Sequence, residues 1–305
     1  MEKRKFGKTG MEVTALGYGA MELRHLQEES ESLHLLNQVL DLGINYIDTS
    51  PDYGPSEDLI GKAISQRREA FFLATKCGCN IDAEGRHLDP AHIWTRKKLQ
   101  ENLETSLRRL KTDHIDVWQI HAASPGDLPG GRTHEVIQTM LDFKAQGKVG
   151  AIGISFRNGR AGDALYPAGY GYEAFQPFLE FGVFDMMQIV YGGMVRVSEN
   201  AITRAADLGL GMVIRGVVKP YFPNFAEMFR AAGLDSLCEP NETMSTFLVR
   251  FALNHPGLHT MIIGTKNPAH LLENIRAVEM GRLPEDIYQE AIKRLDQAGI
   301  TASPV

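Results

Sequence analysis

The sequence has few cysteines, no long apolar segment and no cluster of basic residues, and each of these absences excludes a class of protein. It contains three cysteines (Cys77, Cys79 and Cys238), too few for a disulfide framework and typical of a reducing compartment. The N-terminal residues MEKRKFGKTGMEV lack the apolar core of a signal peptide. No run of about 18 apolar residues is present that could span a bilayer. We therefore expect a cytoplasmic protein without a membrane segment.

The charge is mixed and slightly acidic, with 32 Lys and Arg against 38 Asp and Glu and a net charge of −6. Without a basic patch, a nucleic-acid partner is not expected. The 305 residues are 43% apolar, which is enough for a sizeable core. Length alone would suggest about two domains, but α/β barrels of about 250 residues fold as one. We predict a single domain over residues 1–305 and a monomer or weak homo-oligomer.

Apolar strand-like segments alternate with helical segments along the whole chain. The eight predicted strands are Ala15–Gly19, Asn45–Asp48, Phe71–Thr75, Asp116–Ile120, Val149–Ile154, Asp185–Val190, Gly211–Ile214 and Met261–Ile263. The predicted helices are Glu31–Leu42, Ser56–Arg67, Pro90–Leu110, Thr133–Gln146, one within Gly159–Phe181, Glu199–Leu208, Glu242–Leu253 and Pro268–Val278. This alternation favours parallel strands with right-handed crossovers. Eight such units predict a (β/α)8 TIM barrel.

Local signals refine this plan. Asp89-Pro90 and Asn267-Pro268 each place an N-cap residue before a first-turn proline. Helix-ending glycines are expected at three positions: Gly43, Gly147 and Gly209. Segments outside the eight units are expected to form an N-terminal β-hairpin (Arg4–Phe6 with Glu12–Thr14) that closes the barrel bottom, and an extra C-terminal helix (Pro284–Gln297).

Four reactive side chains follow three consecutive predicted strands. Asp48 ends the second strand, Tyr53 lies five residues later, Lys76 follows the third and His121 follows the fourth. Taken singly, each has an ordinary structural role, as a turn former, a packed turn aromatic or a satisfied polar group. Because the carboxyl ends of barrel strands meet at one face, the four are expected to converge there.

The set suits the reduction of a carbonyl group by hydride, which needs a proton donor for the developing alkoxide. A phenol with a pKa of about 10 is a slow donor unless a cation stabilises its phenolate. Lys76 can supply that cation and lower the pKa of Tyr53, while Asp48 pairs with Lys76. His121 can hydrogen-bond the carbonyl oxygen and orient the substrate.

These segments resemble the aldo-keto reductase family: DTSPDY carries the Asp and the Tyr, LATK the Lys and VWQIH the His. The resemblance extends over the whole chain. It implies that Tyr53 is the proton donor and that NADPH (NADP) binds across the barrel mouth without a Rossmann fold. It also implies that the substrate is a small carbonyl compound or alcohol.

The resemblance also assigns cofactor contacts. GISFRN and MQIVY supply Ser155 and Gln188 for the nicotinamide carboxamide. IIGTKNPAHLLENI resembles the segment that holds the adenosine 2′-phosphate, at the start of a helix where anions bind favourably. The residues that it implies are Gly264, Thr265 and Lys266 for the phosphate, with His270, Glu273 and Asn274 towards the adenosine.

The sequence departs from the family pattern at three positions, one of which is His270, in a place often held by Arg or Gln. Phe156 follows Ser155 where an Asn is usual, which leaves Asn158 as a substitute. Arg215 ends the seventh strand in place of an aromatic residue, as in the subgroup resembling bacterial and potassium-channel β-subunit-like members. Arg215 is then expected to contact the pyrophosphate or ribose.

Two further segments are expected near the cofactor. In GYGAM, the backbone near Ala20 and Met21 is expected to approach the nicotinamide, with plain packing as the alternative. The long connection Gly216–Asn241 is interpreted either as a flap that brings Lys219 to the pyrophosphate or as a packed helix over Asn224–Ala232. Apolar side chains that line the pocket or belong to the core are Met21, Trp118 and Met194.

Three functions remain open on the sequence: a reductase, a slow NADP(H)-binding redox sensor, and a metal-dependent hydrolase or lyase. The last is disfavoured because His121 has no second His on a neighbouring strand end, and Cys77 and Cys79 have no usual zinc spacing. We predict no metal site. The two cysteines are interpreted as small side chains beside a strand end.

Overall fold

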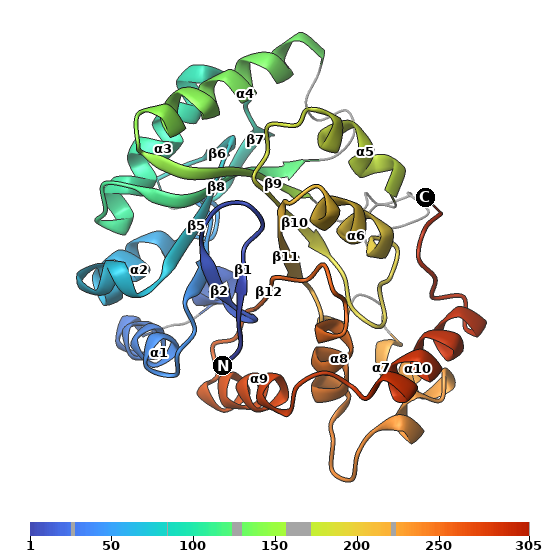
Figure 1. Ribbon diagram of the computed structural model, residues 1–305. Coiled ribbons are helices and arrows are strands. Elements are labelled where there is room, and N and C mark those ends of the chain that lie inside the picture. Colours follow the sequence, from blue (N-terminus) through green and yellow to red (C-terminus); the bar gives the residue numbers. More distant parts are fainter. Residues whose placement is uncertain (26–27, 84, 124–129, 157–171, 221–223, 305) are drawn as a thin grey trace.

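The computed structural model describes residues 1–25, 28–83, 85–123, 130–156, 172–220 and 224–304, and at its centre is a closed barrel of parallel strands (Figure 1). The barrel strands, in their order around the barrel, are β3 (Leu16–Gly19), β4 (Tyr46–Asp48), β5 (Phe72–Cys77), β8 (Ile115–Ala123), β9 (Val149–Phe156), β10 (Met186–Val190), β11 (Gly211–Arg215) and β12 (Thr260–Ile263). β12 pairs with β3 and closes the ring. All eight predicted strands are present, so the predicted TIM barrel is confirmed.

Helices cover the outside of the barrel, as Figure 1 shows. Those that connect barrel strands or follow the last one are α1 (Glu29–Asp41), α2 (Ser56–Ile64), α3 (Arg96–Leu110), α4 (Gly130–Ala145), α5 (Tyr172–Glu180), α6 (Glu199–Asp207), α7 (Phe225–Ala231), α8 (Met244–Leu253) and α9 (Pro268–Met280). The extra C-terminal helix is α10 (Glu285–Gln297). Three 3-10 helices complete the described elements: Ala20–His25, Ser65–Ala70 and Leu234–Leu237. In the described part of the chain, no helix is both long and apolar enough to cross a membrane.

The predicted signals at helix ends are confirmed with one exception. Asn267 caps α9, since its side-chain oxygen accepts the Ala269 N–H at 2.9 Å and Pro268 is the first helical residue. The three predicted glycines adopt positive φ after α1, α4 and α6: Gly43 (86°), Gly147 (75°) and Gly209 (81°).

The exception is the predicted helix start at Asp89-Pro90, which is wrong. Both residues lie in β7 (His87–His92), which pairs antiparallel with β6 (Cys79–Ile81) in a hairpin directly after β5. Helix α3 starts later, where Thr95 accepts the Lys98 N–H at 3.3 Å. The hairpin escaped prediction because its second strand is polar, exposed and contains a proline, which are poor strand signals.

The barrel bottom is closed by the predicted N-terminal hairpin, formed by β1 (Lys3–Lys5) and β2 (Glu12–Thr14). Phe6 follows β1 and is fully buried. It packs with apolar inward-facing side chains at the lower end of the barrel, among them Tyr46 and Val117. Its ring lies so close to Gly211 that a Cβ there would be 2.7 Å away, so only glycine fits at this position.

Candidate active site

Asp48 occupies the last position of β4, and its carboxylate accepts hydrogen bonds from three side chains. Lys76 Nζ donates to Oδ1 at 2.6 Å, and the amides of Gln119 and Gln188 donate to Oδ2 at 2.9 and 2.8 Å. These donors lie on β5, β8 and β10, so one carboxylate connects four barrel strands. The three bonds offset the cost of burying a charge that is only 1% exposed.

Lys76 is fully buried on β5 and also donates to the Thr49 carbonyl at 2.7 Å. Burial by itself lowers the pKa of Lys76, but the charge and hydrogen bond of Asp48, with Tyr53 and Asp52, together raise it by more. The pKa of Lys76 therefore lies above its ordinary value. Its ammonium is charged at neutral pH, as the predicted pairing with Asp48 requires.

Tyr53 lies in the turn between β4 and α2, and Lys76 Nζ is 5.0 Å from the centre of its ring. Burial raises the pKa of Tyr53, the Lys76 charge lowers it, and the Asp48 and Asp52 charges raise it again. Lys76 lowers the pKa of Tyr53 as predicted, but burial outweighs the cation, so that pKa lies above its ordinary value. The phenol is protonated at neutral pH, which is the form that can donate a proton.

His121 follows the buried part of β8, and its ring meets the Tyr53 ring edge-on with centroids 6.0 Å apart. Burial lowers the pKa of His121 to about 3, so the imidazole is neutral at neutral pH. Its Nδ1 lies 3.3 Å from Ser50 Oγ and 3.5 Å from Asp52 Oδ1. A neutral imidazole with Nδ1 as acceptor carries its proton on Nε2, which can then donate to a ligand.

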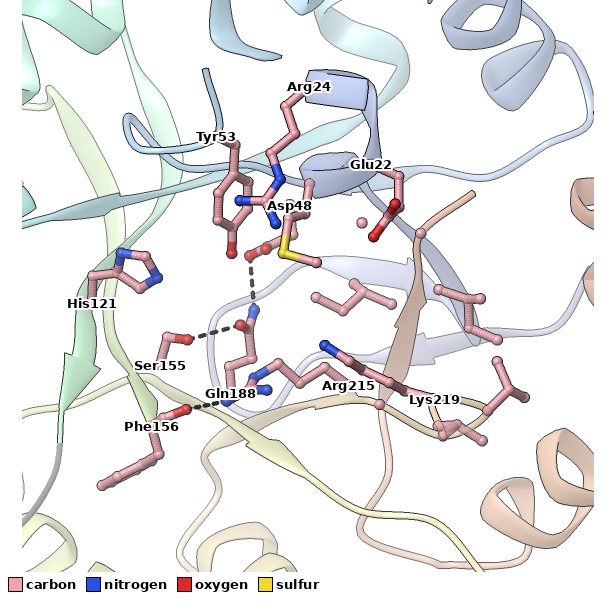
Figure 2. Close-up of a pocket in the computed structure, with 18 of the residues that line it drawn as sticks. Glu22, Arg24, Asp48, Tyr53, His121, Ser155, Phe156, Gln188, Arg215 and Lys219 are labelled. Carbon is pink, nitrogen blue, oxygen red and sulfur yellow. Dashed lines mark hydrogen bonds between the residues drawn. The ribbon is translucent and has the colours of Figure 1, made fainter. Parts of the chain in front are cut away.

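The four predicted catalytic residues therefore come together at the mouth of the barrel. Asp48, Tyr53 and His121 line a cavity of about 600 Å³ (Figure 2), and Lys76 lies behind them in contact with Asp48. Ten predicted site residues line this cavity: Met21, Asp48, Tyr53, His121, Ser155, Gln188, Arg215, Gly216, Lys219 and Gly264. Two unpredicted charged residues, Glu22 and Arg24, also line it from the 3-10 helix after β3.

Ser155 and Gln188 form a pair on the cavity wall opposite Tyr53. Ser155 Oγ donates to Gln188 Oε1 at 2.8 Å, and Gln188 Nε2 donates to Asp48. Figure 2 shows the chain of contacts from Ser155 through Gln188 to Asp48. The two residues that the resemblance assigns to the nicotinamide are thus linked to the carboxylate that holds Lys76.

Phe156 directs its ring away from the cavity. It packs edge-on against Phe175 and Phe178 of α5, with centroids 4.4 and 5.0 Å apart. The Phe156 carbonyl accepts a hydrogen bond from the Arg215 guanidinium, which lies at the cavity (Figure 2). The Phe156 side chain is therefore part of the helix packing. Asn158, the alternative at this position, lies outside the described residues.

The predicted phosphate segment lies at the start of α9, mostly beyond the cavity wall. Lys266 and His270 are exposed, and Thr265 is buried, with its carbonyl accepting from the Tyr18 hydroxyl at 2.8 Å. Of the two residues expected near the adenosine, Asn274 is buried and Glu273 accepts from Thr243 at 3.0 Å. These contacts fix the segment beside the mouth and leave the Lys266 side chain in solvent.

Three other expected positions belong to the core. Trp118 is fully buried and packs against Phe143 of α4, on the outer face of β8. Met194 and Ala20 are also buried and do not line the cavity. The inward-facing residues of β8 are Val117, Gln119 and His121, in strict alternation. This period of two is the sequence signal that could have identified Gln119 and excluded Trp118.

The connection after β11 contains a packed helix, which was the alternative to a flap at this position. α7 spans Phe225–Ala231, and its Phe225 and Phe229 are each 3% exposed. Phe229 meets Phe247 of α8 edge-on, with centroids 5.6 Å apart. Val217, Val218, Lys219 and Pro220 line the cavity, while residues 221–223 lie outside the described part. Closure of this segment as a flap stays a prediction.

The β6–β7 hairpin adds residues that the sequence did not reveal. Cys79 Sγ lies 3.2 Å from His121 Nδ1, and the His92 and His121 rings meet edge-on at 5.5 Å. His87 Nε2 lies 2.9 Å from Asp52. The sequence argument considered only histidines at neighbouring strand ends and therefore missed His92, which comes from a hairpin and not from a barrel strand.

A family model matches residues 15–170, and its description is the aldo/keto reductase family. Two relatives from Bacillus subtilis are similar over most of the chain. The aldo-keto reductase YhdN is 30% identical and covers 89% of this chain and 87% of its own, and the uncharacterized oxidoreductase YqkF is 26% identical and covers 94% of each.

Solved structures show the same fold. The holo form of the aldo-keto reductase AKR11C1 from Bacillus halodurans superposes with a TM-score of 0.80 at 24% identity, covering 96% of both chains. The likeness extends over the whole barrel and its helices.

Proposed function

The chain belongs to the aldo/keto reductase family, and we propose that it reduces aldehydes or ketones to alcohols with NADPH, with Tyr53 as the proton donor. One observation carries the proposal: the buried Lys76 ammonium bonds Asp48 at 2.6 Å and lies 5.0 Å from the centre of the Tyr53 ring. The three free cysteines suit a reducing cytoplasm.

The residues around the cavity suit a nicotinamide dinucleotide. Ser155 Oγ and Gln188 Oε1 keep lone pairs that can accept from a carboxamide NH2 group. Arg215 and Lys219 bring two positive charges to the cavity wall, which suits a pyrophosphate. The N-terminus of α9 with the exposed Lys266 suits a 2′-phosphate, since helix N-termini and ammonium groups both favour anions.

The bound cofactor would supply the hydride, and the protein would supply the proton. Tyr53 donates from its hydroxyl to the oxygen of the carbonyl as negative charge develops there. The phenolate left behind is stabilised by the Lys76 ammonium, which Asp48 holds in place. Because burial keeps Tyr53 protonated, the donor form is the resting form.

His121 would orient the substrate. Its neutral ring can donate one hydrogen bond from Nε2 to the carbonyl oxygen while Nδ1 accepts from the Cys79 thiol, 3.2 Å away. Two donors that converge on one oxygen fix the carbonyl and increase its polarisation. The apolar side chains of Met21 and Ile262 also line the cavity and give the rest of a small substrate a non-polar surface.

The proposal is tested by following nicotinamide absorbance with a panel of small aldehydes, ketones and diketones, with NADPH and NADH in parallel. We expect turnover that is faster with NADPH at low cofactor concentration. Tight NADPH binding with no turnover on any member of the panel would instead indicate the redox sensor. Faster turnover with NADH would contradict the proposed cofactor preference.

A further inference from the structure

Cys79, His92 and His121 form a cluster of metal-ligating side chains beside the cavity. One ligand atom from each residue lies within 4.8 Å of the other two. The Cys79 Sγ to His121 Nδ1 distance is 3.2 Å. The cluster joins a barrel strand to the β6–β7 hairpin, and Cys79 and His92 are direct partners across that hairpin.

The ligand types and their spacing suit a soft divalent cation. One thiolate with two imidazoles is a zinc ligand set, and three protein ligands leave a fourth position open. With bonds of about 2.0–2.1 Å to nitrogen and about 2.3 Å to sulfur, tetrahedral donor atoms lie roughly 3.3–3.7 Å apart. The Cys79–His121 separation is close to this range already, and the third ligand must move inward by roughly 1.5 Å at most.

The surrounding residues hold the cluster in this arrangement. The Trp94 ring is stacked on His92 at 5.5 Å with an interplanar angle of 3°. Trp94 in turn fits over Gly78, where a Cβ would lie 2.1 Å from the indole and where φ is +86°. The Asn102 side chain bonds the Gly78 N–H at 2.9 Å and the Cys79 carbonyl at 3.1 Å. Supporting contacts of this kind orient metal ligands.

The charges nearby favour a cation. The Asp52 carboxylate lies 3.5 Å from His121 Nδ1. The buried Lys76 ammonium is balanced by Asp48 at 2.6 Å. A divalent ion that replaces the thiol proton of Cys79 would therefore bring two positive charges next to one carboxylate and one thiolate.

We propose that Cys79, His92 and His121 bind Zn²⁺, and that the bound ion inhibits the reductase. On binding, the Cys79 thiol releases its proton to solvent and the thiolate and the two imidazoles donate electron pairs to the metal. Contraction of the cluster moves the His121 ring towards β7 and away from Tyr53, so His121 no longer orients the carbonyl. Zinc binding is independent of the proposed function; the inhibition rests on it.

Binding is tested with Co²⁺ as a spectroscopic probe and with Zn²⁺ in isothermal titration calorimetry. We expect a thiolate-to-cobalt charge-transfer band in the wild type that is lost in Cys79→Ser. Cys79→Ser and His92→Gln should each weaken Zn²⁺ binding roughly ten-fold or more, since changes even to supporting residues have effects of this size. Cys238→Ser and His114→Gln, which change residues outside the cluster, are the matched controls and should bind as the wild type does.

Absence of the charge-transfer band, or equal Zn²⁺ affinity in Cys79→Ser and the wild type, would overturn the site. Inhibition is tested by NADPH oxidation in the presence of Zn²⁺ and of Mg²⁺. We expect inhibition by Zn²⁺ and not by Mg²⁺, and His92→Gln should reduce the fractional inhibition when each protein is compared with its own turnover without metal. Zinc that binds at the cluster and leaves turnover unchanged would contradict the inhibition. A wild type with no turnover would contradict the proposed function while the cobalt spectrum still decides the site.

Discussion

The two ends of the barrel differ in chemistry, although the same strands build both. On β8, Val117 packs in the apolar cluster around Phe6, Gln119 bonds Asp48, and His121 lies at the cavity. On β4, Tyr46 lies in the lower cluster and Asp48 ends the strand. Inward-facing residues near the N-terminal ends of the strands therefore contribute to stability, and those near the C-terminal ends contribute to chemistry.

Apolar packing fills the lower end of the barrel, whereas paired charges and hydrogen bonds occupy the upper end. Phe6 fills the bottom against a glycine that allows its close approach. At the top, Asp48 and Lys76 satisfy each other and their neighbours through hydrogen bonds. Changes below should thus alter stability alone, while changes above should alter activity, and stability too where a buried charge loses its partner.

The largest effect is expected for Lys76→Met, which removes one partner of the buried pair. An uncompensated Asp48 carboxylate should lower the free energy of unfolding by about 3–5 kcal/mol, and activity should fall as well. Chemical denaturation measures the first and NADPH oxidation the second. Lys62→Met is the control, because its pair with Glu29 is exposed and contributes at most about 1 kcal/mol. If both variants lost a similarly small amount of unfolding free energy, the Asp48–Lys76 pair would not be a strongly coupled buried pair.

Phe6→Ala should reduce stability to a similar degree without affecting catalysis. Truncation of a fully buried phenylalanine costs about 3–5 kcal/mol, and the cavity would form at the end of the barrel away from Tyr53. Urea denaturation and kcat per folded molecule are the measurements. Phe181→Ala, at a side chain that is 38% exposed, should change stability far less. A lower kcat in folded Phe6→Ala would show that the two ends are coupled.

Lys266→Ala should weaken the binding of NADPH but not of NADH, and it should leave stability unchanged. Loss of one charge-assisted contact to a phosphate, about 1.5–3 kcal/mol, weakens NADPH binding roughly ten-fold or more and leaves NADH binding unchanged. Fluorescence titration with each cofactor measures this. Lys97→Ala, on the outer helix α3, should bind both cofactors as the wild type does. An equal loss for NADPH and NADH would exclude a 2′-phosphate contact.

A smaller change in the free energy of unfolding is expected when pH alters the protonation of His259 at the lower end of the barrel. Burial, with the Arg4 charge, lowers the pKa of His259 to about 4, and its Nδ1 accepts the Met212 N–H at 3.0 Å. The unfolded chain therefore binds a proton more readily. The free energy of unfolding should fall as pH decreases from about 6.5 to about 4, and then level off. His259→Asn keeps an acceptor and should reduce this fall by on the order of 1 kcal/mol, measured by urea denaturation. Identical pH dependence in both proteins would contradict the effect.

Most of the barrel could be predicted because its strands are apolar and its helices carry capping signals. The convergence of the four candidate catalytic residues could be predicted because barrel topology brings strand ends together, whatever the details of packing. The β6–β7 hairpin could not, since its polar strand pairs only through tertiary contacts. That one omission concealed the histidine and cysteine beside His121. The net direction of the Tyr53 pKa shift could not be predicted either, because the extent of burial is set by packing and not by sequence spacing.

The central claim is that Tyr53 delivers the proton in a site already formed by Asp48, Lys76 and His121. Turnover and NADPH affinity in Tyr53→Phe test it most directly, because the substitution removes only the hydroxyl. We predict that turnover falls about 10²–10⁴-fold while NADPH binding and stability stay close to wild type. Turnover within about a factor of two of the wild type, in a folded variant that binds NADPH, would contradict the claim.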